Sequence, residues 1–348
     1  MSTPLIVDGN ALVVRSLWGG LKDEIKHGLP FTSGIYGTLN TLGILVEHHA
    51  IEAGQIVAFF DHVPPPHRVR LLPDYKQGRR EHWPRAYREK VGVEFDTEEE
   101  DLGVFESVEQ RMAAFAQLGQ VYNLLPLLGI TTLCYREREA DDGVAACARV
   151  FLKRGVRPVL VTGDHDLWQT IGWGARVWDL GQTRMVDSAN FVTRAKCATD
   201  TYTLFRALTG DASDRIRGAE GFGPKRASEL LDRAHWHVRI VREPREQLRE
   251  LCRFLREQPK LSKAEKQLLK DRKRLDRVIR AIDLRDSFGR TRGLEKRLEA
   301  RLPVREQDFI RACRELGLGG AGRRLVRPFL AAQALRDKKA RGEGRKRS

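Results

Sequence analysis

Carboxylate side chains gather beside apolar residues in the stretch 139–166. The acids of this stretch are Glu139, Asp141, Asp142, Asp164 and Asp166. The first three open the segment 140–151, whose alanine-rich composition predicts a helix, and the last two follow the apolar run 159–161, which predicts a buried strand. Carboxylates that lie close together cannot all stay ionised unless cations hold them. The stretch therefore predicts metal chemistry.

Two further aspartates end apolar runs nearer the amino terminus. Asp8 follows the run 5–7, and Asp61 follows the run 56–60. Either residue alone would be explained as a turn residue or a helix cap. Together with Asp164 they repeat one placement, and ligand sites in an open α/β sheet form outside the carboxyl ends of the strands. We therefore expect these side chains to meet at one edge of a sheet.

The elements that must position these acids alternate between strands and helices from residue 5 to 180. This alternation predicts an α/β fold with a mostly parallel central sheet flanked by helices on both faces. The span 62–133 is expected to be an insertion between two sheet elements, and long insertions often serve as lids or binding loops. Within it, residues 75–83 mix cations with aromatic side chains, which suits a nucleic-acid backbone but equally describes an exposed basic loop.

A second, helical and basic region follows the sheet elements. Asp211 and Asp214 precede a glycine turn at 221–225, which is expected to open a helix. Backbone amides at such a helix start bind phosphate readily, and Lys225 and Arg226 add positive charge there. The expected organisation is a core at 1–198, a duplex-binding region at 199–330 and an unstructured basic tail at 331–348.

The composition describes a soluble globular chain of 348 residues, with 41% hydrophobic and 31% charged residues. A net charge of +15 beside clustered acids suggests a polyanionic partner and metal ions, and a merely basic soluble protein is the alternative. The five cysteines are scattered and odd in number, which favours reduced thiols in a cytosolic compartment over a zinc site. No apolar stretch approaches the roughly 18 residues that span a bilayer, and no signal peptide precedes the first expected strand.

Several motifs stand in an order that resembles the 5′-nuclease (flap endonuclease) family. That family includes the 5′–3′ exonuclease domain of bacterial DNA polymerase I and the stand-alone phage 5′-exonucleases. The motifs are VDGN at 7–10, FD at 60–61, YK at 75–76 with Arg79, EADD at 139–142, TGDHD at 162–166, and TGDASD at 209–214 leading into GFGPK at 221–225. The resemblance implies a PIN-like, Rossmann-like nuclease core, with the insertion as a helical arch or clamp for the free 5′ strand.

The resemblance also implies two groups of ligands for two Mg²⁺ or Mn²⁺ ions. One group matches Asp8, Asp61, Glu139, Asp141 and Asp142, and the other matches Asp164, Asp166, Asp211 and Asp214. All nine positions keep an acid, so an inactivated relative is not expected. Asp142 is expected to be essential for catalysis, together with Lys76 and Arg79 at the base of the arch, which match residues that contact the scissile phosphate.

The same resemblance implies where DNA is bound. The residues expected to contact it are Arg15, Tyr75, Lys76, Arg79, Arg80, Lys225 and Arg226. The glycine turn resembles the family's helix-three-turn-helix, which grips the duplex backbone and holds a potassium ion through carbonyl groups. By that analogy, the carbonyls of Ala219 and Phe222 would bind K⁺.

The expected function is a structure-specific 5′-nuclease that hydrolyses phosphodiesters at 5′ flaps and 5′ ends of DNA by a two-metal-ion mechanism in replication and repair. Expected partners are branched or flapped DNA, RNA–DNA hybrids at primers and a replicative polymerase, but no membrane. We expect a cytoplasmic monomer, at the nucleoid or in the host cytoplasm of a phage. The alternatives are a nonenzymatic DNA-structure-binding protein on the same fold, and a different acid-rich α/β enzyme such as an RNA-cleaving relative or a phosphatase.

Overall fold

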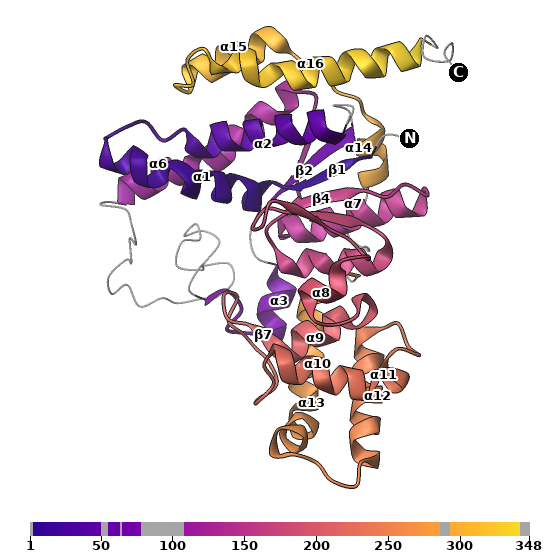
Figure 1. Ribbon diagram of the computed structural model, residues 1–348. Coiled ribbons are helices and arrows are strands. Elements are labelled where there is room, and N and C mark those ends of the chain that lie inside the picture. Colours follow the sequence, from indigo (N-terminus) through magenta and orange to yellow (C-terminus); the bar gives the residue numbers. More distant parts are fainter. Residues whose placement is uncertain (1–2, 50–54, 63–64, 78–107, 286–292, 342–348) are drawn as a thin grey trace.

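A six-stranded sheet forms the centre of the computed structural model, which describes residues 3–49, 55–62, 65–77, 108–285 and 293–341 (Figure 1). The sheet order is β3-β2-β1-β4-β5-β6, and every pair is parallel except β5 with β6. The strands are β1 (Leu5–Asp8), β2 (Ile56–Phe60), β3 (Thr131–Cys134), β4 (Val159–Thr162), β5 (Arg176–Asp179) and β6 (Arg184–Val186). The predicted α/β fold with a mostly parallel sheet is confirmed.

The central strands are apolar on both faces, as parallel strands covered by helices require. Because successive side chains point to opposite faces, Ile6 and Leu160 enter one apolar cluster, whereas Val7 and Val161 enter the other. The first cluster continues without a break into the carboxy-terminal helices as far as Leu294. The sheet and the region after residue 199 therefore share one core.

Helices cover the two faces of the sheet in separate layers (Figure 1). On the Val7 face lie α1 (Gly9–Lys26), α2 (Ser33–His49) and α6 (Val108–Leu124). On the Ile6 face lie α7 (Ala140–Lys153), the 3₁₀ helix η3 (His165–Trp173) and α9 (Tyr202–Thr209). A third layer packs across α2 and consists of α15 (Glu306–Glu315) and α16 (Ala321–Ala340).

The region after the sheet is helical, as predicted, and lies at the opposite end of the molecule from α16 (Figure 1). It contains the hairpin β7 (Gly210–Asp211) and β8 (Ile216–Arg217), followed by α10 (Pro224–Arg233), α11 (His235–Val238), α12 (Pro244–Glu257) and α13 (Lys263–Ile282). Other described elements are α3 (Pro66–Leu71), η2 (Leu125–Leu127), α8 (Phe191–Ala195), η4 (Thr199–Thr201) and α14 (Leu294–Glu299). Within the described ranges, no helix is long and apolar enough to cross a membrane.

Two predicted boundaries are wrong. The insertion does not extend to residue 133, because α6 packs on α1 and α2 through buried Ala114 and Val121 and thus belongs to the core, and β3 begins at Thr131. The tail is not unstructured from residue 331, because α16 continues to Ala340 and buries Ala332. Residues 78–107, the middle of the arch predicted at 62–133, and the last residues, 342–348, lie outside the described residues.

Candidate active site

The aspartates at the ends of β1 and β2 hold the first turns of two helices. Asp8 is 6% exposed, and its Oδ1 accepts a hydrogen bond of 2.9 Å from the Ala11 amide at the start of α1. Its Oδ2 accepts one of 3.0 Å from the Thr162 hydroxyl at the end of β4. Asp61 follows β2, and its Oδ1 accepts a hydrogen bond of 2.6 Å from the Ala140 amide at the start of α7. The helix-cap and functional-site interpretations of these residues are therefore compatible.

The start of α7 brings three more acids to the same edge of the sheet. Glu139 is the residue before the helix, and Asp141 and Asp142 lie in its first turn, where the helix dipole favours negative charge. All three side chains are buried. The helix can approach β2 this closely because residue 143 is glycine, since a Cβ there would lie 2.2 Å from the Phe59 ring.

The remaining four acids come from η3 and from the β7–β8 hairpin. Asp164 caps η3 by accepting a hydrogen bond of 2.7 Å from the Asp166 amide, and Asp211 accepts one of 2.8 Å from the Ser213 amide. The Asp214 carbonyl accepts a hydrogen bond of 2.9 Å from the Lys76 amide, which ties the hairpin to the segment after α3. All nine predicted acids lie in one cluster at the carboxyl ends of the strands. Each of them either pairs with a cation that another acid also contacts or lies close enough to another acid to be affected by its charge.

Among the described residues, four buried or half-buried cations contact this acidic cluster. Lys76 Nζ lies 2.7 Å from Glu139 Oε1 and 3.6 Å from Asp214 Oδ2. The guanidinium of Arg68, in α3, forms ion pairs with Glu139, Asp141 and Asp142. The other two are Arg138, whose Nη1 lies 3.6 Å from Asp142 Oδ2, and Arg206, in α9.

Arg206 joins two acids of the second group. Its Nε lies 2.9 Å from Asp166 Oδ1, and its Nη2 lies 2.5 Å from Asp211 Oδ2. The sequence prediction did not include Arg68, Arg138 or Arg206. A signal was present for two of them, because Arg138 directly precedes Glu139 and Arg206 precedes Asp211 by five residues. No comparable signal marked Arg68, because it stands between His67 and Val69, two residues before Arg70, and arginines in such a segment are usually exposed.

The electrostatics of the cluster show an excess of negative charge. Burial, reinforced by the charge of Asp61, raises the pKa of Asp8 to about 7. Burial and the charge of Asp166 also raise the pKa of Asp164. Burial acts in the same direction on Glu139, but the charges of Lys76 and Arg68 outweigh it and lower the pKa of that carboxyl to about 2. Burial raises the pKa of Asp141 as well, even though Arg68 lies beside it, so the cations do not offset the whole of the buried negative charge.

This donor set fits divalent metal ions. It consists of carboxylate oxygens, which Mg²⁺ and Mn²⁺ prefer over the nitrogen and sulfur ligands that zinc prefers. Added positive charge would also relieve the repulsion that raises the pKa of Asp8. In the described conformation, however, no three acidic, histidine or cysteine side chains are arranged so that they could share one ion.

The predicted DNA-contacting residues fall in different places. Lys225 and Arg226 are exposed in the first turn of α10, where Arg226 Nη1 donates a hydrogen bond of 3.0 Å to the Gly221 carbonyl. Tyr75 is only 3% exposed, and its hydroxyl donates a hydrogen bond of 2.8 Å to Glu139, so its predicted contact with DNA is not supported. Arg79 and Arg80 lie outside the described residues.

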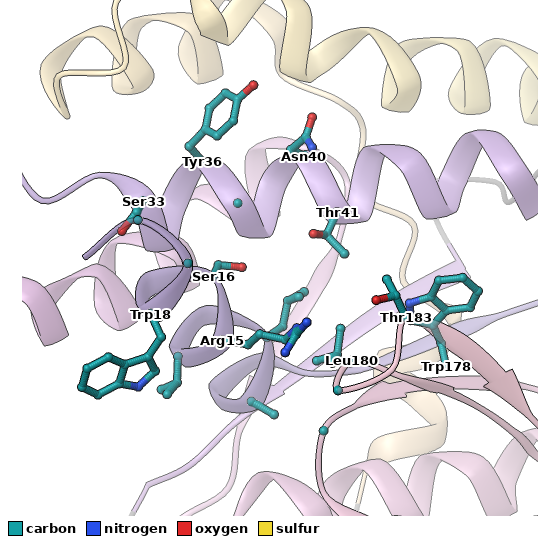
Figure 2. A pocket seen from close by; sticks show the side chains of 18 residues that line it. Arg15, Ser16, Trp18, Ser33, Tyr36, Asn40, Thr41, Trp178, Leu180 and Thr183 are labelled. Atoms are coloured by element: carbon teal, nitrogen blue, oxygen red, sulfur yellow. The ribbon is translucent and has the colours of Figure 1, made fainter. Parts of the chain in front are cut away.

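Arg15 is exposed on α1 and lines a cavity of about 970 Å³ between α1, α2 and the loop after β5 (Figure 2). The cavity reaches Gly163, the residue before Asp164. Figure 2 shows the Arg15 side chain directed toward Leu180 and Thr183, and Tyr36 and Asn40 come from α2. Arg15 therefore lies beside the acidic cluster, on the face of the sheet opposite α7.

The predicted potassium ligands lie in the turn that leads into α10. The Ala219 carbonyl accepts a hydrogen bond of 3.1 Å from the Phe222 amide. Arg274, in α13, donates hydrogen bonds of 2.6 Å and 2.7 Å to the carbonyls of Arg217 and Gly218. A protein cation thus already satisfies the carbonyls next to Ala219.

Comparison with known proteins identifies the family. Residues 3–197, more than half of the chain, match the 5′-3′ exonuclease, N-terminal resolvase-like domain. The chain belongs to this family. The matched residues include seven of the nine acids, whereas Lys225, Arg226 and the β7–β8 hairpin lie beyond them.

Relatives of this family member include stand-alone nucleases and polymerases. The 5′-3′ exonuclease of Streptomyces coelicolor is 31% identical over 239 residues, which are 65% of this chain and 70% of that protein. The 5′-3′ exonuclease of Aquifex aeolicus is 26% identical over 66% of this chain and 69% of its own length. DNA polymerase I of Deinococcus radiodurans is 26% identical over 66% of this chain, but the match spans only 20% of the polymerase.

A solved structure shares the fold. The T5 5′-exonuclease, determined with divalent zinc ions bound, superimposes with a TM-score of 0.62 at 19% sequence identity. The match covers 89% of this chain and 99% of the T5 protein. At this identity the likeness establishes the fold, which includes the region after the family domain.

Proposed function

We propose that this family member is a divalent-metal-dependent 5′-nuclease that hydrolyses phosphodiesters at 5′ flaps and 5′ ends of DNA. The observation that carries the proposal is the convergence of nine carboxylates at the carboxyl ends of β1, β2 and β4. Relatives named as 5′-3′ exonucleases, and the flap endonuclease Xni of Psychromonas ingrahamii, support it. The T5 D15 flap endonuclease, which shares the fold with a TM-score of 0.60, has been solved with DNA and metal ions.

The proposed ligands for two Mg²⁺ or Mn²⁺ ions fall into two groups. The first is Asp8, Asp61, Glu139, Asp141 and Asp142, and the second is Asp164, Asp166, Asp211 and Asp214. When bound, such ions supply a hydroxide nucleophile at neutral pH and stabilise the leaving oxygen. The donor chemistry and the raised pKa of Asp8 support this assignment.

The chain's own cations would bind and orient the DNA. Lys76 lies between the two groups of acids, where its ammonium can offset charge that develops on the phosphate. Lys225 and Arg226 are exposed where the amides of α10 begin, which suits the duplex backbone. A potassium ion at the Ala219 and Phe222 carbonyls, RNA–DNA hybrids as substrates and a polymerase as a partner complete the proposal.

The test is cleavage of a 5′-labelled flapped duplex with Mg²⁺ by the wild type and by Asp142→Asn. The matched control is Asp187→Asn, an aspartate in the turn after β6 that does not touch the cluster. We expect the wild type and the control to release short labelled products, and Asp142→Asn to lose at least about 100-fold in rate while still binding DNA. Full activity of Asp142→Asn would refute the assignment, and a salt-sensitive mobility shift without any cleavage would favour the nonenzymatic alternative.

A further inference from the structure

Arg68 occupies the middle of the first group of acids. It is 3% exposed; its Nη1 lies 3.0 Å from Asp141 Oδ2 and also contacts Glu139, and its Nη2 lies 3.0 Å from Asp142 Oδ1. No other cation in the described part of the chain contacts all three of these acids. One guanidinium therefore collects the oxygens that the proposed function assigns to a metal ion.

A guanidinium and a divalent ion compete for these carboxylates. Each is a cation that needs the carboxylate lone pairs, and two cations a few ångströms apart in a buried site repel one another strongly. The ion pairs of Arg68 also explain why no three of the described acids are arranged around a point where they could share one metal ion. The carboxylates instead face the fork of the arginine.

One hydrogen-bond donor of Arg68 also lacks an acceptor. Its Nε is buried and has no hydrogen-bond partner among the described residues. It belongs to α3, which has only six residues and no side-chain cap at its start. A short helix of this kind can shift more easily than α7, whose buried residues pack against the sheet.

We infer that Arg68 is a placeholder cation: it holds Glu139, Asp141 and Asp142 together in the metal-free protein and withdraws when a divalent ion binds the first group. Ion binding at this group is then a competition with Arg68, and α3 moves when the ion binds. The inference rests on the proposed function only for the identity of the ligands. The opposing view is that Arg68 is a permanent structural ion pair that stays in place when ions bind.

The experiment measures Mn²⁺ binding by calorimetry in the absence of DNA. Arg68→Gln removes the competing charge, and Arg70→Gln is the matched control, because Arg70 is exposed on the same helix and its Nε donates to the Pro66 carbonyl. We expect Arg68→Gln to bind the first Mn²⁺ about tenfold more tightly than the wild type, because a competitor has been removed. We expect the control to match the wild type.

Thermal unfolding gives a second readout. Without metal, Arg68→Gln should unfold at a lower temperature than the wild type, because Glu139, Asp141 and Asp142 lose the one guanidinium that contacts all three. Added Mn²⁺ should raise its Tm by more than it raises that of the wild type. If Arg68→Gln cannot be purified, Arg68→Lys is used instead. Lysine keeps the charge but has a single nitrogen in place of the two that contact carboxylates, so the Mn²⁺ affinity of this variant should exceed that of the wild type.

Mn²⁺ affinity at or below the wild-type value in the variant measured would overturn the inference and favour the permanent ion pair. Flap cleavage by the wild type is assayed separately. Tight Mn²⁺ binding that Arg68→Gln strengthens, without any DNA cleavage, would refute the proposed function and leave the placeholder standing.

Discussion

Replacing Asp8 by asparagine should stabilise the metal-free protein at alkaline pH. The pKa of this carboxyl is raised from 3.8 to about 7, chiefly by burial and then by the charge of Asp61. The folded state therefore binds the proton more tightly than the unfolded state, so stability falls as pH rises from about 4 to about 7 and is constant above that. Asparagine carries no charge and avoids this loss.

The magnitude follows from the pKa difference of about three units. At about 1.4 kcal/mol per unit, ionised Asp8 costs the folded state up to ~4 kcal/mol above pH 7. Asparagine keeps an oxygen for the Ala11 amide but disturbs the hydrogen bond from the Thr162 hydroxyl, which offsets about 1 kcal/mol. The expected net gain is about 2–3 kcal/mol at pH 8.

The assay is urea unfolding in EDTA at pH 5 and pH 8, with Asp23→Asn on the exposed side of α1 as the control. The stability difference between Asp8→Asn and the wild type should grow between these two pH values, and the control should show no such growth. With Mn²⁺ present the ranking should reverse, because only the wild type keeps the carboxylate ligand. A difference that is independent of pH, or an Asp8→Asn protein less stable than wild type at pH 8 in EDTA, would refute the reasoning.

Three further outcomes are expected. Lys76→Met should lower the single-turnover rate on flapped DNA by about 100-fold, because an ammonium between the two groups of acids is removed, while duplex affinity measured by anisotropy changes little. The double variant Lys225→Gln and Arg226→Gln should bind duplex DNA more weakly than the wild type. A plot of the logarithm of the binding constant against the logarithm of salt concentration should become less steep, by about 0.9 for each DNA phosphate that the protein no longer neutralises. An unchanged slope would count against α10 as an element that binds the DNA backbone. Gly143→Ala should cost about 1–3 kcal/mol of stability in chemical denaturation, since its Cβ would meet the Phe59 ring at 2.2 Å, and a near-neutral result would mean that α7 can shift.

The parts of the site that follow from strand ends could be predicted from the sequence. Asp8, Asp61 and Asp164 each follow a buried parallel strand, and parallel strands end at one edge, so their convergence requires no knowledge of side-chain packing. Arg68 could not be predicted in this way. Its burial depends on three carboxylates that lie about 70 residues away in the sequence, and local patterns carry no record of such partners.

Local composition gives the wrong expectation where tertiary packing decides whether a side chain is buried. Tyr75 stands in a basic run that resembles an exposed nucleic-acid contact, yet its hydroxyl is bonded to buried Glu139. The lysines and arginines of α16 likewise suggest a solvated tail, but Phe329 and Ala332 on its other face pack into the core. In both segments, a few apolar or hydrogen-bonded positions outweigh the charged majority.

The hydrogen bond from the Lys76 amide to the Asp214 carbonyl has a consequence for biosynthesis. At roughly 5–20 residues per second, a ribosome needs roughly 10–40 s to pass from Asp8 to Asp214, and the acidic cluster is incomplete throughout that time. A nascent chain therefore lacks two of the nine clustered acids until the β7–β8 hairpin has emerged. Fragments released by premature termination before this hairpin would lack Asp211 and Asp214, which are half of the second group of proposed metal ligands.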